Sequence, residues 1–406
     1  MSVQRTGRWG LETTAPTTDA LLRLERLIDD FVTFDAELPT HLGEAVAEPA
    51  APMAHVVMGL FLAQANTAAD HLKAAAIAEG MADVDLNPRE ALHRAALTDW
   101  LDGESEAAIA RWEQILQQWP TDMFALRMQY FALFSRGRCA EMLASSRRSI
   151  DAWGDLDRRT YLEGMASFAL EELGEYDEAE RLGRTAAEAD PTDLWSIHAV
   201  AHVLEMQARS DDGLIWFEGR DDVLHSRGSF ARHLWWHHAI IHLRTGNHGR
   251  LLELYDTEIQ PGDAIDALSL TNAIDGLARL EFAGVDVGDR WLPLLEPSTV
   301  RIGHHTHPFA DAHFAYAIAR AGAEDQVAAL LDGMASWRDR SGTASRVISQ
   351  VGLDTATAMA ALGAGRANEA TPLFERTQGS RWQLGGSHAQ REVFELAQRF
   401  AATTST

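Results

Sequence analysis

The sequence predicts an all-α protein that folds as a solenoid of stacked helical hairpins. Three observations predict this fold class. The chain is rich in Ala, Leu and Glu and has only 12 Pro, its apolar residues recur at helical spacing, and glycines follow the helical runs at a regular interval. Hairpins stacked side by side curl, so we expect a superhelix around a concave pocket.

Glycines that end helical runs give the length of the repeat. They are Gly103, Gly137, Gly174, Gly246, Gly284 and Gly322. The intervals between them are 34, 37, 72, 38 and 38 residues, and a period of this size is typical of tetratricopeptide-like hairpins. The tripeptide Pro-Thr-Asp, which ends one helix and caps the next, occurs at Pro120 and again two periods later at Pro191.

Periodic apolar residues between these stop and cap signals place the individual helices. We expect helices at 18–36, 53–64, 68–82, 88–101, 105–118, 122–136, 139–151, 158–173, 177–189, 193–207, 211–218, 229–245, 248–259, 265–283, 308–321, 324–335, 345–362, 366–378 and 388–402. They form one solenoid domain over 17–402, with His-rich hairpins at 193–283 and a connecting loop at 284–307. Residues 1–16 and 403–406 are expected to be disordered.

Charge and composition limit the partners. The formal charge of −25 repels phosphate backbones and anionic lipid, and no run of Lys or Arg offsets it, so neither nucleic acid nor a membrane is expected as a partner. Acidic residues are expected on outer helix faces, where they favour solubility. Examples are Glu171, Glu172, Glu175, Asp177, Glu178 and Glu180. The single cysteine and the lack of a long apolar run favour a cytoplasmic protein.

Histidines at helical spacing mark the candidate site. His198, His202 and Glu205 lie at i, i+4 and i+7, so they share one stripe of a helix. On the next long helix, His233 and His237 form one such pair, and we expect them to face the concave side. The pair His238 and His242 is rotated by about 100° from it. These two histidines face the pocket or pack against the neighbouring helix.

The stripe of His198, His202 and Glu205 is the candidate catalytic group, because an imidazole polarised by a carboxylate moves protons near neutral pH. The candidate ligand-binding residues are His233, Trp236, His237, Asn272, His307, Asp311, His313, Ser387 and His388. Several have structural alternatives: Trp236 in a helix interface, Asn272 on a backbone carbonyl, Asp311 in the first turn of a helix and Ser387 in a capping box with Gln390.

No metal or other cofactor is expected. Two histidines four residues apart are compatible with zinc, and Glu205 or His237 would complete three ligands. The motif His-Glu-x-x-His is absent, however, because Ala199 occupies the position of its glutamate, and no cysteine assists. A divalent ion such as zinc is therefore the alternative.

Four strings resemble a known family, the tetratricopeptide repeat protein 38 type. They are Ser196 to Met206, His233 to Leu243, His307 to His313 and Gly385 to Phe394, with a weaker fifth piece at Met53 to Gly59. The resemblance implies an α-solenoid throughout and carries over no activity. It also suggests that the four strings belong to one site, since the inner helices of a solenoid share a concave wall.

Two functions follow from these observations. The first is a His/Trp/Glu-lined pocket for a small organic or peptide-like ligand, with His-mediated acid–base chemistry of hydrolase or lyase type left open. The alternative is a non-catalytic scaffold that binds an extended peptide of a protein partner. Grooves that capture a carboxylate terminus need Lys, Arg and Asn on the inner face, and Lys is absent after Lys73, so the pocket is favoured.

Overall fold

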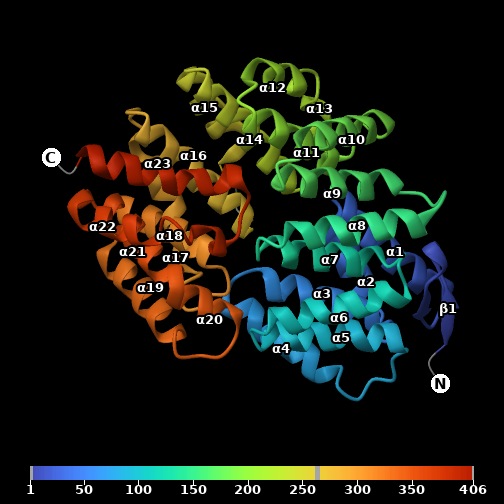
Figure 1. Cartoon of the computed structure of the whole chain (residues 1–406). Coiled ribbons are helices and arrows are strands. Elements are labelled where there is room, and N and C mark those ends of the chain that lie inside the picture. Colours follow the sequence, from blue (N-terminus) through green and yellow to red (C-terminus); the bar gives the residue numbers. More distant parts are fainter. Residues whose placement is uncertain (1–2, 261–265, 405–406) are drawn as a thin grey trace.

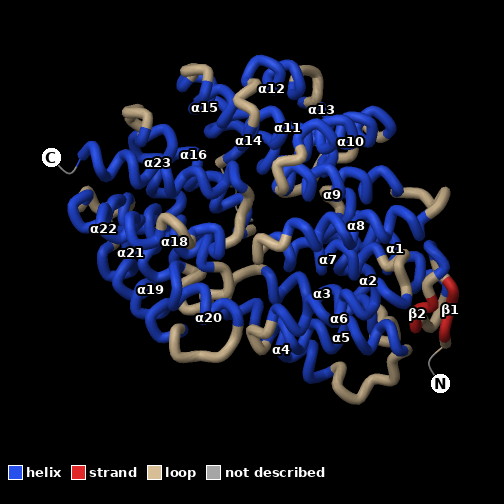
Figure 2. Tube along the Cα trace, in the orientation of Figure 1, coloured by secondary structure: helices blue, strands red, loops and turns tan. Residues whose placement is uncertain are grey.

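Antiparallel helix pairs make up the N-terminal half of the molecule. The computed structural model describes residues 3–260 and 266–404. Its first regular array runs through α5 (Pro88–Leu101), α6 (Ser105–Gln118), α7 (Met123–Phe134), α8 (Cys139–Trp153), α9 (Arg159–Glu172), α10 (Tyr176–Ala189) and α11 (Leu194–Met206). Each helix packs on its neighbour in sequence, and α9 also packs on α11. The array is therefore a row of hairpins with an inner and an outer layer (Figures 1 and 2).

Four helices and a small hairpin precede this array. The helices are α1 (Thr18–Thr33), α2 (Leu38–Val46), α3 (Pro52–Gln64) and α4 (Ala68–Gly80). Before them, β1 (Gln4–Thr6) pairs antiparallel with β2 (Glu12–Thr14) around the short helix η1 (Arg8–Gly10). We expected residues 1–16 to be disordered, whereas residues 3–16 are anchored: the Thr14 amide donates to Glu90 at 2.7 Å and the Trp9 indole donates to Asp157 at 2.9 Å.

Helices of unequal length turn the chain through the middle of the molecule. They are α12 (Ser210–Phe217), α13 (Asp221–His225), α14 (Phe230–Arg244), α15 (His248–Leu254) with the π-helical turn η2 (Tyr255–Ile259), and α16 (Ala267–Phe282). The region 284–307, expected to be a plain connecting loop, contains η3 (Gly288–Leu294) and α17 (Leu295–Thr299).

A second array completes the chain. It comprises α18 (Pro308–Arg320), α19 (Glu324–Trp337), α20 (Thr343–Val347), the π-helical turn η4 (Ile348–Gly352), α21 (Leu353–Gly363), α22 (Ala367–Thr377), η5 (Arg381–Leu384) and α23 (His388–Thr404). The one helix expected at 345–362 is thus divided by a π-helical turn. The expected disordered tail at 403–406 begins inside α23, while residues 405 and 406 lie outside the described residues.

The two arrays meet, so the solenoid curls back on itself, while the two chain ends lie apart (Figure 1). The Thr343 amide donates to the Gly103 carbonyl at 3.0 Å, and the Thr306 hydroxyl donates to Asn66 Oδ1 at 3.1 Å. At the other face the His388 amide donates to Glu172 at 3.0 Å. One contiguous apolar core extends from Trp9 to Ala401. The all-α solenoid is therefore curled around its inner helices.

Small residues set the spacing of the inner helices. A Cβ atom added at Gly164 of α9 would lie 2.3 Å from the Ser196 hydroxyl and 3.2 Å from the Ser196 amide of α11. By contrast, a Cβ at Gly276, in the middle of α16, would meet only Tyr255, at 3.9 Å. The contact of α9 with α11 therefore depends on the absence of a side chain at Gly164.

We predict opposite effects for alanine at these two helical glycines. Gly164→Ala should destabilise the fold by about 1–3 kcal/mol, because the methyl group forces α9 and α11 apart. Gly276→Ala, the matched control, should stabilise it by about 0.5–1 kcal/mol through helix propensity. Urea unfolding followed by circular dichroism measures both. An unchanged midpoint for Gly164→Ala would contradict the close approach.

Candidate functional site

Histidines of α11 and α14 converge in the interior of the molecule. The side chains of His198, His202, His233 and His237 are all buried, and one ligand-type nitrogen from each lies within 4.8 Å of the corresponding nitrogen of every other. His233 Nε2 is 3.1 Å from His198 Nε2 and 3.3 Å from His237 Nε2. The sequence-predicted stripes on the two helices therefore face each other across the helix interface.

Local capping fixes the position of α11. Asp193 is the N-cap residue: its carboxylate accepts hydrogen bonds from the amides of Trp195 at 2.9 Å and Ser196 at 3.2 Å. The helix therefore begins at Leu194, and His198 and His202 both fall on its inner side, one turn apart.

Oxygen acceptors lie behind two of the imidazoles. Glu205 Oε2 lies 2.8 Å from His237 Nδ1, and Asn272 Oδ1 of α16 lies 3.1 Å from His233 Nδ1. Arg244 donates to the other oxygen of Glu205 at 3.1 Å. Glu205 therefore supports His237 and not the two histidines of its own stripe, contrary to the predicted group of His198, His202 and Glu205.

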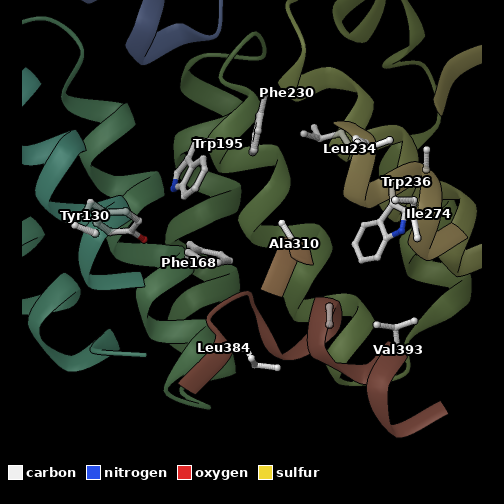
Figure 3. Packing of buried hydrophobic residues seen from close by; sticks show 14 of the residues in the cluster. Tyr130, Phe168, Trp195, Phe230, Leu234, Trp236, Ile274, Ala310, Leu384 and Val393 are labelled. Atoms are coloured by element: carbon white, nitrogen blue, oxygen red, sulfur yellow. The ribbon is translucent and has the colours of Figure 1, made fainter. Parts of the chain in front are cut away.

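A cavity of about 340 Å³ adjoins the histidines. Phe168, Trp195 and Phe230 form an aromatic wall, with ring centroids of neighbouring pairs 5.4 and 5.3 Å apart. Ala310 and Leu384 line the cavity as well, and Figure 3 shows them across from these rings. His198, His202 and His233 contribute polar edges. The cavity therefore combines a mostly apolar lining with few hydrogen-bonding groups, as in small-molecule sites.

The buried imidazoles are neutral at physiological pH. Burial lowers the pKa of His237 to about 3 and holds the pKa values of His198, His202 and His233 well below the ordinary value. The neighbouring imidazoles lower the pKa of His198 further, since each disfavours a positive charge on the next. These side chains therefore serve as acceptors or ligands rather than as proton donors.

Two carboxyl groups expected on an outer face are buried instead. Glu171 and Glu172 end α9 on its inner side, and Glu171 Oε2 lies 3.6 Å from His202 Nδ1. Burial raises the pKa of Glu172 to about 7 and raises that of Glu171 well above its usual range. The expectation of a solvated acidic face was wrong for these two residues, because both lie on the buried side of α9.

The other predicted site residues separate into two groups. His307 and Ser387 line the cavity. Ser387 also forms the capping box that was its structural alternative, since its hydroxyl accepts from the Gln390 amide at 3.1 Å and its amide donates to Gln390 Oε1 at 2.9 Å.

Four predicted residues lie outside the cavity lining, as do Glu205, His237 and Asn272. The Trp236 indole donates to Asp275 at 2.7 Å, Asp311 lies 3.1 Å from His305 Nδ1, and His313 Nδ1 lies 2.8 Å from the Phe309 carbonyl. The fourth, His388, is exposed. Each of the first three contacts another residue of this chain and lies outside the cavity lining.

Sequence reasoning missed the aromatic wall and the cation behind it. The Arg127 guanidinium is buried against Phe34, Phe131 and Trp195, with its carbon 4.8, 4.7 and 4.2 Å from the three ring centroids. None of its nitrogens has a hydrogen-bond partner among the described residues, and burial lowers its pKa to about 10. The available signal was an arginine inside the almost wholly apolar run Met123 to Phe134.

The four strings quoted in the sequence analysis meet at this cavity. Its lining includes His198 and His202 from the first string, His233 from the second, His307 and Phe309 from the third, and Gly385, Gly386, Ser387 and Gln390 from the fourth. The weaker fifth piece, Met53 to Gly59, contributes no lining residue. The common site that the resemblance suggests is therefore present as a geometric feature.

No family model matches the chain. Two solved structures are similar to it: the APC/C hetero-tetramer Cut9–Hcn1, with 11% identity, TM-score 0.40 and coverage of 85% of this chain, and the P58(IPK) TPR domain, with 13% identity, TM-score 0.20 and coverage of 87%. This chain spans 62% of the first and 98% of the second. The solenoid assignment rests on the helix pairs themselves. Among the described helices, none is both long and apolar enough to cross a bilayer.

Acidification is predicted to destabilise the fold. Burial lowers the pKa values of His307 and His313 to about 4, whereas an unfolded chain has about 6.5. The unfolded state therefore binds protons first, and stability that is present above pH 6.5 is lost progressively towards pH 4. Thermal unfolding between pH 7 and 5 should show a falling midpoint.

Two variants test the source of this slope. His313→Gln should flatten it, while His225→Gln, which alters an exposed histidine, should leave it unchanged. A pH slope that is the same in His313→Gln and in the wild type would show that this buried histidine is not linked to folding.

Proposed function

We propose that the chain binds a small organic ligand in the cavity lined by His198, His202 and His233. The observation that carries the proposal is the combination of about 340 Å³ of space with an aromatic wall and a few polar edges. Such a volume lies in the usual range for ligand pockets. The resemblance of the four lining strings to the tetratricopeptide repeat protein 38 family supports a shared site.

The lining indicates the chemistry of the ligand. Trp195, Phe168 and Phe230 suit a flat aromatic or otherwise apolar body. Neutral imidazoles and the Ser387 hydroxyl suit a hydrogen-bonding group at one end. A ligand with an apolar body and one polar head group fits both requirements.

Closure of the solenoid favours a small ligand over an extended peptide at the inner wall. A peptide groove needs a continuous open face. Here the contacts of Thr343 with Gly103 and of Thr306 with Asn66 join the two arrays, and η5 and the start of α23 line the cavity together with the inner helices.

The residue roles in this proposal are binding roles. Neutral His198, His202 and His233 accept hydrogen bonds, and Glu205 and Asn272 orient the imidazoles behind them. Proton abstraction from a bound ligand by a neutral imidazole is the catalytic extension of the same geometry. It requires a substrate with an acidic proton at the polar end.

A cavity-filling variant tests this function. A library of small aromatic carboxylic acids and amides is screened by ligand-observed NMR against the full chain. We expect hits that bind the wild type and are lost in Ala267→Trp, because this half-buried alanine lines the cavity and the indole occupies it. Ala283→Trp lies outside the cavity and should keep them. Hits that survive Ala267→Trp would overturn the proposal.

A second candidate, a protein-interaction scaffold, is favoured by a surface cleft of about 450 Å³ between α14, α16 and α23. Leu243, Leu396 and Phe400 give it an apolar floor, and Arg399 adds positive charge at the same cleft. Arg244 lines the cleft as well but is paired with Glu392. These features suit an apolar peptide segment with an acidic residue.

The variants Ala267→Trp and Ala283→Trp also test the scaffold, with their roles exchanged: Ala283→Trp now blocks the site and Ala267→Trp is the control. Selection of a phage-displayed peptide library on the full chain should enrich apolar sequences that carry an acidic residue. Their binding should be lost in Ala283→Trp, which places an indole in the cleft, and kept in Ala267→Trp. If no sequence is enriched, or if binding survives Ala283→Trp, the cleft is not a peptide site.

A further inference from the structure

Four imidazoles, those of His198, His202, His233 and His237, lie close together in the interior. Hydrogen bonds among them do not explain all of the short distances between their nitrogen atoms. A carboxylate accepts hydrogen bonds, so the contact between Glu205 and His237 places the proton of this imidazole on Nδ1. The contact between Asn272 Oδ1 and His233 does the same for His233. Both Nε2 atoms are then bare lone pairs, and they lie 3.3 Å apart.

Two lone pairs at this distance repel each other unless a positive centre lies between them. A proton on His198 Nε2 would satisfy its 3.1 Å contact with His233. It would leave the contact of His233 with His237 without a proton. A chain of hydrogen-bonded histidines therefore accounts for one of the two short contacts only.

A tetrahedral metal ion accounts for both contacts. Nitrogen ligands lie about 2.0–2.1 Å from zinc, which places the corners of the tetrahedron about 3.3 Å apart. The two measured separations are 3.1 and 3.3 Å. Both lie close to this edge length, whereas a hydrogen bond accounts for the 3.1 Å contact only.

The fourth imidazole has the same arrangement of an outer oxygen and a free inner nitrogen. His202 Nδ1 lies 3.6 Å from Glu171 Oε2, and neither nitrogen of His202 has a hydrogen-bond partner among the described residues. Both Glu171 oxygens are likewise without a hydrogen-bond partner there. Unpartnered buried polar atoms are rare and point to a missing ligand. Histidines that bind metals usually have a carboxylate or carbonyl behind them.

Carboxylates pair with two of the nearby cations, Arg244 and Arg279, and so weaken their repulsion of a metal ion. Both still disfavour a positive charge on His237, and Arg127, unpaired among the described residues, disfavours one on His198, so the four imidazole ligands must outweigh this repulsion. Arg244 pairs with Glu205 at 3.1 Å and with Glu392 at 2.9 Å. Arg279 pairs with Asp275 at 2.7 Å and with Glu392 at 2.7 Å. Both guanidinium groups are therefore tied away from the imidazole nitrogens.

We propose that His198, His202, His233 and His237 bind one zinc ion, with Glu205, Asn272 and Glu171 as the oxygen partners behind three of them. Neutral imidazoles suit zinc among the common divalent metals, and a closed set of four protein ligands gives the tetrahedral geometry that zinc prefers. A bound zinc ion would take up the imidazole nitrogens of His198, His202 and His233 that the proposed function gives to the ligand as acceptors. The metal measurement needs no ligand in the adjoining cavity, so its failure and the failure of the proposed function are told apart.

Metal analysis of the tag-free full-length chain tests the site. The protein is treated with a chelator, reloaded with zinc chloride and desalted, and bound zinc is measured by mass spectrometry. We expect one equivalent in the wild type, none in His233→Gln, and about 10–100-fold weaker binding in Glu205→Gln. His238→Gln, which alters a histidine stacked on Phe217, is the matched control and should bind like the wild type.

Cobalt gives a readout that needs no variant. Wild-type chain loaded with Co²⁺ should show the strong visible absorption of a tetrahedral site. If His233→Gln does not fold, as judged by circular dichroism, this spectrum decides the question. Wild-type protein without zinc after reloading, zinc retained in folded His233→Gln, or the weak spectrum of solvent-bound cobalt would each overturn the proposal.

Discussion

A polar group carried into the interior of a helical stack needs a partner there, and this requirement organises the centre of the molecule. The imidazoles of α11 and α14 contact one another, His233 takes a partner from α16, and His202 lies beside Glu171 of α9. Glu205 holds Arg244, and Arg244 holds Glu392 of α23. The histidine cluster and the packing of the last helix are thus parts of one polar network joined through Arg244.

The sequence predicted the architecture and the main elements of the site because both depend on short-range periodicity. Spacing alone placed His198 with His202 and His233 with His237, and the glycine intervals gave the hairpin length. Spacing within one helix does not determine, however, how far that helix is shifted along its axis relative to its neighbour. The partner of Glu205 could therefore not be predicted: it is His237, across the interface, and not His202 on the same stripe.

The missed features have physical reasons too. Glu171 and Glu172 were assigned to solvent because glutamate is rarely buried unpaired. In the structure both carboxyl groups are buried at the end of α9, where Glu171 faces His202. The N-terminal hairpin has three-residue strands, which are too short for an alternating pattern. Its order comes from long-range hydrogen bonds such as that between Thr14 and Glu90.

The aromatic wall was missed because Phe168 and Trp195 look like ordinary core residues. Only the cavity beside them and Arg127 behind them distinguish them.

The joining of the two arrays restricts how this protein can change over evolution. An open solenoid tolerates the gain or loss of a repeat, because each added hairpin contacts only its neighbours. Here Thr343 must reach Gly103 and Thr306 must reach Asn66, so one extra hairpin would move both pairs out of register. The number of hairpins is therefore a fixed property of this architecture, and divergence among related chains should be confined to outer surfaces and turns.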